Sequence, residues 1–212
     1  ISQAGHYISA YALGVVVGAP VLTALASRFK ARTALMGLMG CFAVFNTLSA
    51  MADSSALLFA ASFLAGLPHG AFFGIGAVVA KNLAPPGLAA RAAATMFAGL
   101  TVANVLGVPA GTLIGQSVGW QWTFVLVGAV GVLAMLAIYL LLPDVQTESE
   151  LDWSVLRRGS LWSVLALTVI GTGGFFAWYS YIAPLVTGVT GLSDRWVTVA
   201  TILAGVGMTV GN

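Results

Sequence analysis

The sequence predicts an all-α protein that crosses a membrane several times. Hydrophobic residues make up 59% of the 212 residues and charged residues only 7%, and the mean hydropathy is +1.01. A soluble domain carries about 25% charged residues, so this composition excludes a water-soluble fold. Apolar runs long enough to span a bilayer recur along the chain. The single cysteine, Cys41, lies in one of these runs; it excludes an internal disulfide and is expected to be a small buried filler.

Seven apolar runs divide the chain into expected membrane segments. At about 1.5 Å per residue, a helix of about 20 residues crosses a hydrocarbon core of about 30 Å. The last run is shorter than a full span. The expected segments lie at 5–27, 33–52, 56–80, 93–116, 120–142, 161–190 and 196–212.

The basic residues predict how these segments are oriented. Seven of the eight lysines and arginines lie in alternate connections, and only Arg195 lies in the others. By the positive-inside rule, the connections that carry the seven face the cytoplasm, so the segment at 5–27 crosses from outside to inside. The seven are Arg28, Lys30, Arg32, Lys81, Arg91, Arg157 and Arg158.

A stripe of small residues marks the segment at 93–116. Positions four apart lie nearly above one another on a helix, so the stripe is a face with almost no side chains. Such faces let membrane helices approach closely, and a proline within the helix loosens its local hydrogen bonding. The stripe therefore predicts either a contact at which two helices slide or rock, or a static packing face. Its members are Gly99, Ala103, Gly107, Gly111 and Gly115, with Pro109 between them.

Two further patterns indicate two related halves. The Gly14–Gly18 spacing recurs as Gly207–Gly211 in the last segment, in the same orientation, and parallel six-span halves are one known transporter architecture. The most polar stretch, 143–160, separates an N-terminal half, 1–142, from the start of a C-terminal half, 161–212. We expect this stretch to be a cytoplasmic linker that ends in a short interfacial helix, or a solvated connector without a partner.

Several stretches resemble the major facilitator superfamily. Residues 99–115, with Pro109 among them, are similar to the antiporter motif of its fifth helix. Residues 107–115, followed by Gly119–Phe124, resemble the twelve-span drug/proton antiporter branch, and in particular its arabinose-efflux-permease-like members. Residues 11–20 and 66–74 resemble the same branch. The resemblance covers essentially the whole chain, as family helices two to seven and most of eight.

The resemblance implies a fold, a function and a location. The fold is a major-facilitator-type helical bundle, of which this chain is expected to lack the first helix and most of the C-terminal half. The function is secondary active transport, as proton-coupled efflux of a small amphiphilic solute by alternating access. That solute is a drug-like compound, a sugar or a related metabolite. The expected partners are this solute, protons and the lipid bilayer, with no nucleic acid, and the protein is expected to be a monomer in the inner membrane of a bacterium.

The sequence departs from the family pattern at two places. Arg28 and Arg32 match the basic positions of the cytoplasmic-loop signature after the second helix, but the aspartate that helps to latch the closed state is absent. The two arginines therefore contact helix ends and headgroups, or are ordinary positive-inside anchors. Ser62 stands where the family often has an arginine in the fourth helix. These losses keep open a transport-inactive sensor or scaffold on the same fold.

His69 is the candidate residue for carrying protons. It is the only titratable side chain deep within an expected segment, and histidine exchanges protons near neutral pH. Ionisable groups in membranes are costly unless they have a partner, and they usually mark a functional pathway. Ser62 lies two turns earlier on the same helix face, so the pair could shuttle a proton or bind a solute hydroxyl. The alternative is a neutral structural histidine, hydrogen-bonded to Ser62 or to a backbone carbonyl beside Pro68.

Aromatic residues are the candidate cavity wall, because the resemblance places the family's fourth and seventh helices at the cavity. Aromatic walls with few hydrogen-bonding groups suit amphiphilic solutes, although such clusters also form ordinary helix packing. Asn46 and Asn104 are polar within apolar segments and are expected to bridge helices. The candidate wall comprises Phe73, Phe176, Trp178, Tyr179 and Tyr181.

No pattern in the sequence supports an enzyme. The chain has no His-Glu-x-x-His, no Gly-x-Ser-x-Gly and no paired aspartates within a segment. We therefore expect no catalytic residue, no cofactor and no metal site.

The expected orientation predicts which positions a reagent reaches from each side of the membrane. In a protein without Cys41, single cysteines at Ser27 and Ser193 should react with an impermeant thiol reagent from opposite sides. The reason is that Ser27 lies in a cytoplasmic connection and Ser193 in an external one. Labelling of intact cells and of inverted vesicles measures this, and labelling of both positions from one side would contradict the orientation.

Overall fold

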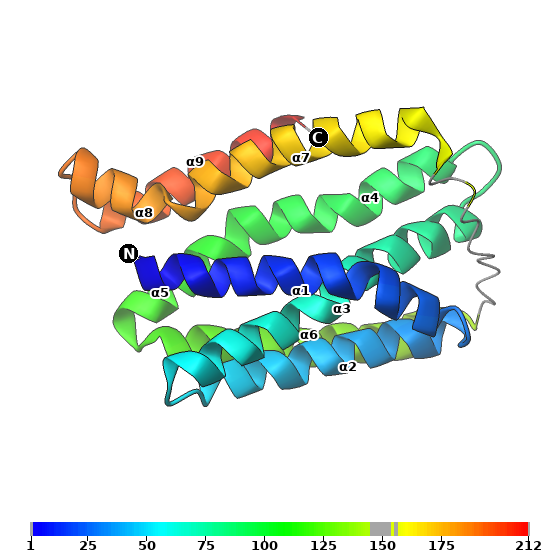
Figure 1. Cartoon of the computed structure of the whole chain (residues 1–212), viewed down its shortest axis with the longest axis horizontal. Helices are drawn as coiled ribbons and strands as arrows, with labels where there is room; N and C mark the ends of the chain where they lie inside the picture. The colour runs from blue at the N-terminus through cyan, green and yellow to red at the C-terminus, as the bar shows by residue number, and fades with distance from the viewer. Residues whose placement is uncertain (1, 145–153, 155–156, 212) are drawn as a thin grey trace.

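The computed structural model describes residues 2–144, 154 and 157–211, and every regular element in these residues is helical (Figure 1). The long helices lie side by side along one axis, so successive connections alternate between the two ends of the bundle (Figure 1). The interfacial helix expected within 143–160 falls largely outside the described residues.

The first three helices are joined by short connections. They are α1 (Ser2–Ala26), α2 (Ala31–Ala50) and α3 (Ser55–Leu83). The start of α3 is fixed by Ser54, whose hydroxyl accepts a hydrogen bond of 3.2 Å from the backbone amide of Leu57. This bond satisfies one of the amides left without a partner at a helix N-terminus.

The segment expected at 93–116 is a helix interrupted by one π-helical turn. α4 (Ala89–Val102) passes through η1 (Ala103–Gly107) into α5 (Val108–Ser117). Pro109 has no amide proton to donate, and its ring crowds the carbonyl four residues back, so it disturbs the hydrogen bonds of an α-helix. The amide just after η1 instead donates to the carbonyl of Ala103, five residues back. The ribbon bends where α4 leads into α5 (Figure 1).

Of the remaining helices, α6 packs against α2, whereas α7 and α9 lie together on the other side of α4 (Figure 1). The segment expected at 161–190 ends its regular α-helix at Ser180, and a second π-helix follows Pro184. The elements are α6 (Trp120–Leu141), α7 (Gly159–Ser180), α8 (Ile182–Pro184), η3 (Leu185–Val189) and α9 (Arg195–Gly211).

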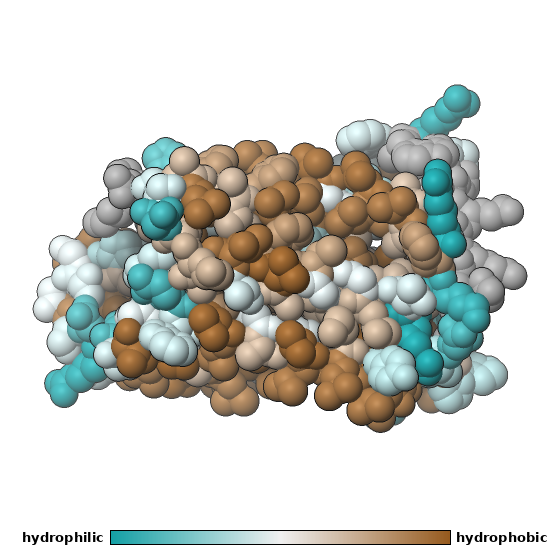
Figure 2. Space-filling view, turned by 90° about the horizontal axis from the view of Figure 1, so that it is seen from below, coloured by the Kyte–Doolittle hydropathy of each residue, from teal (hydrophilic) through white to brown (hydrophobic). Residues whose placement is uncertain are grey.

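Six helices of the described chain are long and apolar enough to cross a membrane. Figure 2 shows a broad hydrophobic belt between two more polar ends, which is the surface that a lipid bilayer requires. The all-α membrane fold expected from the composition is therefore confirmed. The seven clustered basic residues lie at one end of the bundle, here called the basic end, and Arg195 lies at the opposite end. Which end faces the cytoplasm stays a prediction.

The tightest helix contact in the described residues joins α1 to α3, which run parallel. A β-carbon at Gly14 would lie 2.0 Å from the carbonyl oxygen of Phe63, and Gly18 makes a similar contact one turn further along. In return, a β-carbon at Gly66 would lie 2.1 Å from the carbonyl oxygen of Tyr11. No side chain fits at these distances, so the backbones touch directly at glycines on both helices. This set of glycines is called the α1–α3 glycine contact below.

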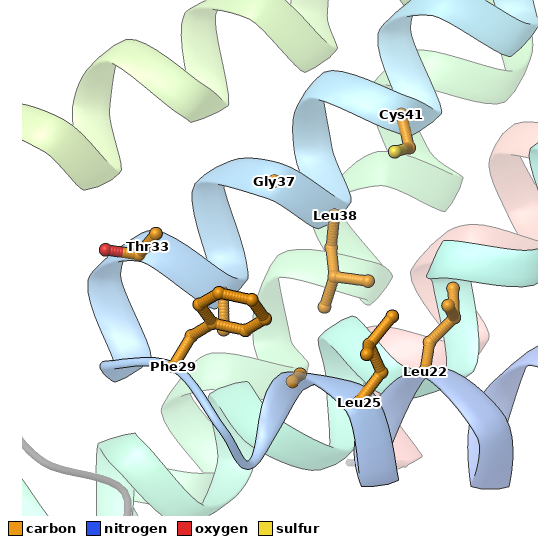
Figure 3. Close-up of a pocket in the computed structure, with 9 residues that line it drawn as sticks. Leu22, Leu25, Phe29, Thr33, Gly37, Leu38 and Cys41 are labelled. Carbon is orange, nitrogen blue, oxygen red and sulfur yellow. The ribbon is translucent and has the colours of Figure 1, made fainter.

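The buried apolar core lies between α2, α3 and the end of α1, and Cys41 is not part of it. The expectation that Cys41 is buried is wrong, because its side of α2 faces outward and the residue is exposed. It borders an open groove of about 280 Å³ between α2 and the end of α1, whose lining includes Leu25, Phe29 and Gly37 (Figure 3). The core cluster comprises Ala26, Ala31, Ala34, Leu35, Leu38, Ala71, Ile75 and Val79.

Two asparagines are buried but do not bridge helices, contrary to expectation. The side-chain amide of Asn46 donates to the carbonyl of Phe42, and that of Asn104 donates to the carbonyl of Leu100, each at 2.8 Å. Each acceptor lies four residues back on the same helix. A short polar side chain can satisfy its donor in this way without a neighbouring helix.

The connection between α1 and α2 is tied to the end of α6 at the basic end. Lys30 Nζ lies 2.5 Å from the Asp144 carboxylate, and Arg32 Nε donates to the carbonyl of Leu142 at 2.7 Å. Arg32 therefore satisfies one of the carbonyls that a helix leaves unpaired at its C-terminus. The ion pair is about half exposed, so it contributes at most about 1 kcal/mol to stability.

Two glycines of α3 predict opposite responses to the same substitution. We expect Gly66→Ala to lower the free energy of unfolding by about 1–3 kcal/mol, because the β-carbon overlaps the backbone of α1. At Gly74 no described atom lies within 4 Å of the added carbon, so Gly74→Ala should leave stability unchanged or raise it slightly. Unfolding in one detergent measures both, and equal stabilities would contradict the α1–α3 glycine contact.

Candidate functional site

A hydrogen-bonded pair of titratable side chains lies within the membrane-spanning part of the bundle. The hydroxyl of Tyr11 on α1 and Nδ1 of His69 on α3 are 2.8 Å apart. The two rings meet edge to face with centroids 5.7 Å apart, and both side chains are half-buried. The α1–α3 glycine contact makes this bond possible, because Gly66 lies one turn before His69 and lets the backbone of Tyr11 rest against α3.

Aromatic rings continue from this pair onto α4. The ring of Phe73 lies 4.9 Å from that of His69, and Phe97 of α4 stacks on Phe73 at 5.7 Å with an interplanar angle of 11°. Phe97 is 40% exposed. Tyr11, His69, Phe73 and Phe97 are called the aromatic row below. It joins three helices and presents one polar pair among apolar rings, which is the surface that an amphiphilic molecule needs.

Among the described residues, no hydrogen bond joins Ser62 to His69, although one of the expected arrangements paired them. Ser62 lies two turns before His69 on α3 and is buried, with 6% of its surface exposed. The described hydrogen bond to Nδ1 comes from Tyr11 on another helix. A role for Ser62 in the pathway stays a prediction.

The candidate aromatic residues of the later helices form two separate groups. Phe176, Trp178 and Tyr179 contact one another or Phe175, all within α7. Tyr181, just after α7, lies against the start of α1, where a β-carbon at Gly5 would be 2.7 Å from its hydroxyl oxygen. Among the described residues, no ring contact joins the α7 group to the aromatic row.

Tyr181 also borders an open cleft of about 400 Å³ at the end opposite the basic residues. Helices from the beginning and the end of the chain meet there, since α1, α5, α8 and α9 all contribute to its lining. The polar lining residues are Gln116, Ser180, Tyr181, Thr187 and Asp194.

The full length of the chain, residues 1–212, matches the sequence profile of the Major Facilitator Superfamily. The chain belongs to this superfamily. The resemblance found in the motifs of α1, α3 and α5 is therefore confirmed for the whole chain.

Three curated members of the superfamily illustrate the relationship. The chain is 38% identical to "Putative transporter AraJ" and 42% identical to "Inner membrane transport protein YdhP", both from Escherichia coli (strain K12). It is 31% identical to "Chloramphenicol resistance protein" of Streptomyces lividans. Each alignment covers 100% of this chain and 55% or 56% of the relative, so the chain spans a little over half the length of these relatives.

The small-residue stripe of the superfamily's antiporter motif faces partly toward α6 and partly toward open space. Thr123 of α6 donates to the carbonyl of Gly111 at 3.0 Å, and a β-carbon at Gly111 would lie 3.2 Å from the Thr123 methyl group. Gly115 lies beside the same threonine. At Gly99 and Gly107 no described atom lies within 4 Å of an added β-carbon. Whether this stripe slides against another helix stays a prediction.

This interrupted helix also approaches α9 closely, at its π-helix and not along the stripe. A β-carbon at Gly205 of α9 would lie 2.9 Å from the carbonyl carbon and oxygen of Asn104 and 2.9 Å from the α-carbon of Val105. A π-helical turn widens a helix locally. The glycine of α9 makes room for this wider turn, so η1 is where the late helix and the antiporter-motif helix touch.

Tyr11 is the site residue that sequence reasoning did not find. In the sequence, Tyr11 is only the first residue of the stretch 11–20, which resembles the superfamily. A signal was nevertheless present, because Tyr11 lies three residues before Gly14 and His69 three residues after Gly66. A polar side chain one turn from a Gly-xxx-Gly pair lies close to the facing helix, where it can find a partner.

Proposed function

We propose that this protein is a secondary active transporter that exports a small amphiphilic solute in exchange for protons. It works by alternating access, as a monomer in the inner membrane of a bacterium. The observation that carries the proposal is the Tyr11–His69 pair, because His69 is at the midpoint of α3 and therefore at the centre of an apolar bundle. An ionisable residue at this depth is costly, and such residues mark ion and substrate pathways.

The aromatic row supports an amphiphilic solute. Its rings offer apolar faces to a flat or partly apolar molecule, and the imidazole beside them offers one polar contact. Similarity to a chloramphenicol resistance protein and to proteins named as transporters supports export of a drug-like compound, a sugar or a related metabolite. Phe176, Trp178 and Tyr179 on α7 would supply a second aromatic surface.

Alternating access requires two bodies that rock, and we propose that residues 1–142 and 161–212 belong to two such halves joined by the linker 143–160. Two contacts between early and late helices support this division. One joins Gly205 to the π-helix η1, and the other joins Tyr181 to Gly5 at the end opposite the basic residues. Both lie where a glycine lets a late helix come close to an early one, so rocking of the two halves would separate or tighten these contacts.

A proton gradient can bias this rocking through His69. Protonation of the imidazole favours the conformation in which water or a counter-charge reaches it, and loss of the proton favours the apolar surroundings. A ligand or proton shifts an equilibrium only by its differential affinity for the two states. Solute bound at the aromatic row and a proton bound to His69 would therefore stabilise different conformations. Exchange of solute for protons requires this difference.

The experiment replaces His69 by alanine in the full-length protein, reconstituted in vesicles. We expect His69→Ala to abolish gradient-driven transport, while solute counterflow, which needs no net proton movement, survives if the cavity is intact. Chloramphenicol is the first solute to use, in view of the relative from Streptomyces lividans. Thermal stability and the amount of inserted protein are measured in parallel, because a structural histidine would lower both.

Each other outcome points to a different role. Gradient-driven transport at the wild-type rate by a well-folded His69→Ala protein would remove His69 from coupling. Loss of both transport modes together with stability would identify a structural histidine. A wild-type protein that binds solute but supports no counterflow would instead favour a sensor or scaffold on this fold.

A further inference from the structure

We propose that Tyr11 positions His69 and passes protons to it. Its hydroxyl donates a hydrogen bond to Nδ1 and so holds the neutral imidazole in the form protonated at Nε2. Protons reach Nδ1 through this hydroxyl. The inference deepens the proposed function and rests on it, because it concerns the same proton site. Nothing in the motif resemblance points to Tyr11, and the geometry alone assigns it this role.

The direction of the hydrogen bond follows from how strongly each group donates and accepts. A neutral imidazole has one nitrogen that donates and one that accepts. A phenolic hydroxyl is a stronger hydrogen-bond donor than the N–H of a neutral imidazole, and an unprotonated imidazole nitrogen is a stronger acceptor than a phenolic oxygen. The bond of 2.8 Å is therefore stronger when the hydroxyl of Tyr11 donates to Nδ1. The neutral tautomer is therefore the one protonated at Nε2.

This tautomer gives the two ring nitrogens different tasks. In the described residues Nε2 has no hydrogen-bond partner, so its N–H can donate to a solute. Nδ1 holds the only free electron pair of the ring, and the Tyr11 hydroxyl covers it. A proton that enters the imidazole must therefore pass through the hydroxyl of Tyr11.

The transfer balances as a simple relay. A water molecule that carries an excess proton gives it to the oxygen of Tyr11, as the O–H bond of Tyr11 breaks and a new N–H bond forms at Nδ1. Tyr11 stays neutral throughout, and His69 becomes the imidazolium cation. In the other conformation the imidazolium releases a proton by the same bonds in reverse: the N–H bond at Nδ1 breaks, its electron pair stays on the ring, the proton passes to the oxygen of Tyr11, and the phenolic proton leaves to water. His69 is then again neutral with its proton on Nε2.

The other titratable groups on the helices packed against α3 lie too far away to replace Tyr11. On α2, Arg32 is at the basic end and bonds to α6, and Cys41 borders the grooves on the outer side of that helix. On α4, Arg91 is in the first turn, six residues and therefore about 9 Å along the helix from Phe97. On α3 itself, Lys81 is 12 residues from His69, which is about 18 Å of helix. On α1, His6 and Tyr7 are at least one turn away from Tyr11 toward the opposite end.

The α1–α3 glycine contact keeps this relay aligned. The carbonyl of Tyr11 rests where Gly66 has no side chain, and Gly14 rests against the carbonyl of Phe63 one turn away. The two helices therefore cannot slide past one another without a clash of backbones. This holds the Tyr11 hydroxyl at hydrogen-bonding distance from Nδ1 rather than leaving the bond to two flexible side chains.

The test measures the two ring nitrogens directly, without any solute. The full-length protein, labelled with ¹⁵N-histidine and placed in lipid nanodiscs, is compared with Tyr11→Phe by nuclear magnetic resonance. Tyr7→Phe is the matched control, because it removes the same hydroxyl four residues earlier on the same helix. His6, which is exposed near the start of α1, serves as the internal reference in every spectrum.

We expect the wild-type and Tyr7→Phe proteins to show a neutral His69 with a protonated Nε2 and a hydrogen-bonded, unprotonated Nδ1. In Tyr11→Phe, the Nδ1 signal should move to the position of a free nitrogen. The rate at which neutral and protonated His69 interconvert should fall by about tenfold or more, since a positioned proton-transfer group contributes at least that much. The His6 signals should be the same in all three proteins if the fold is retained.

Two results would overturn the inference. One is a neutral wild-type His69 with its proton on Nδ1, which would reverse the hydrogen bond. The other is an unchanged or faster interconversion rate in a Tyr11→Phe protein whose His6 signals are normal. Neither depends on transport, so failure of the relay and failure of the proposed proton coupling at His69, which the vesicle experiment tests, are separate outcomes.

Discussion

The direct backbone contact between α1 and α3 is the constraint on which the candidate site depends. In a bilayer, helices gain little from burying apolar side chains against each other, so close backbone packing and a few polar bonds decide how they associate. Here Gly14, Gly18 and Gly66 allow the close backbone packing, and the Tyr11–His69 hydrogen bond is the polar bond. The glycines fix the distance between the helices, and that distance is what lets a hydroxyl on one helix meet an imidazole on the other. Phe73 and Phe97 then extend the same surface onto α4.

The site also shows how one member of the superfamily arranges charge without residues that are common in others. By the motif resemblance, Ser62 stands where an arginine is expected, and the imidazole of His69 lies two turns further along the same helix. The basic end shows a comparable change. The aspartate of the loop signature is absent, but Lys30 pairs with Asp144 and Arg32 bonds to the end of α6. These bonds hold the α1–α2 connection to the end of α6, and none of them uses the position of the absent aspartate.

Much of the fold could be predicted from the sequence because membrane solvation acts on average properties. The apolar composition and the length of each run specify transmembrane helices, and five of the six spanning helices in the described residues begin and end within a few residues of the expected segments. The exception is the segment expected at 161–190, whose regular helix ends at Ser180. The π-helices η1 and η3 could not be predicted, since they depend on how Pro109 and Pro184 redistribute backbone hydrogen bonds. A proline predicts a disturbed helix but does not say which geometry relieves it.

The candidate site was harder to predict, because its partners belong to different helices. His69 is conspicuous in the sequence as an isolated ionisable residue, whereas Tyr11 is one aromatic residue among many and gains its meaning only from α3. The Gly14–Gly18 pair was interpreted as half of an internal repeat, yet its packing partner is α3. The predictions for Cys41 and Asn46 were wrong for a related reason. The sequence shows that Cys41 is in a helix, but not which side of that helix other helices cover. It also does not show that the side-chain amide of Asn46 donates to a carbonyl four residues back on its own helix.

The most direct test of this account is a double-mutant cycle between Gly66→Ala and Tyr11→Phe, with the free energy of unfolding as the measured quantity. If Gly66 sets the distance that the hydrogen bond needs, Gly66→Ala moves α1 away and breaks that bond. Removal of the Tyr11 hydroxyl from this variant then lowers the free energy of unfolding no further. The account therefore predicts that Tyr11→Phe destabilises the wild-type protein by about 0.6 kcal/mol, an average membrane hydrogen bond, and the Gly66→Ala protein by nothing measurable. Strictly additive effects of the two substitutions would show that the bond forms independently of the glycine contact and would contradict the account.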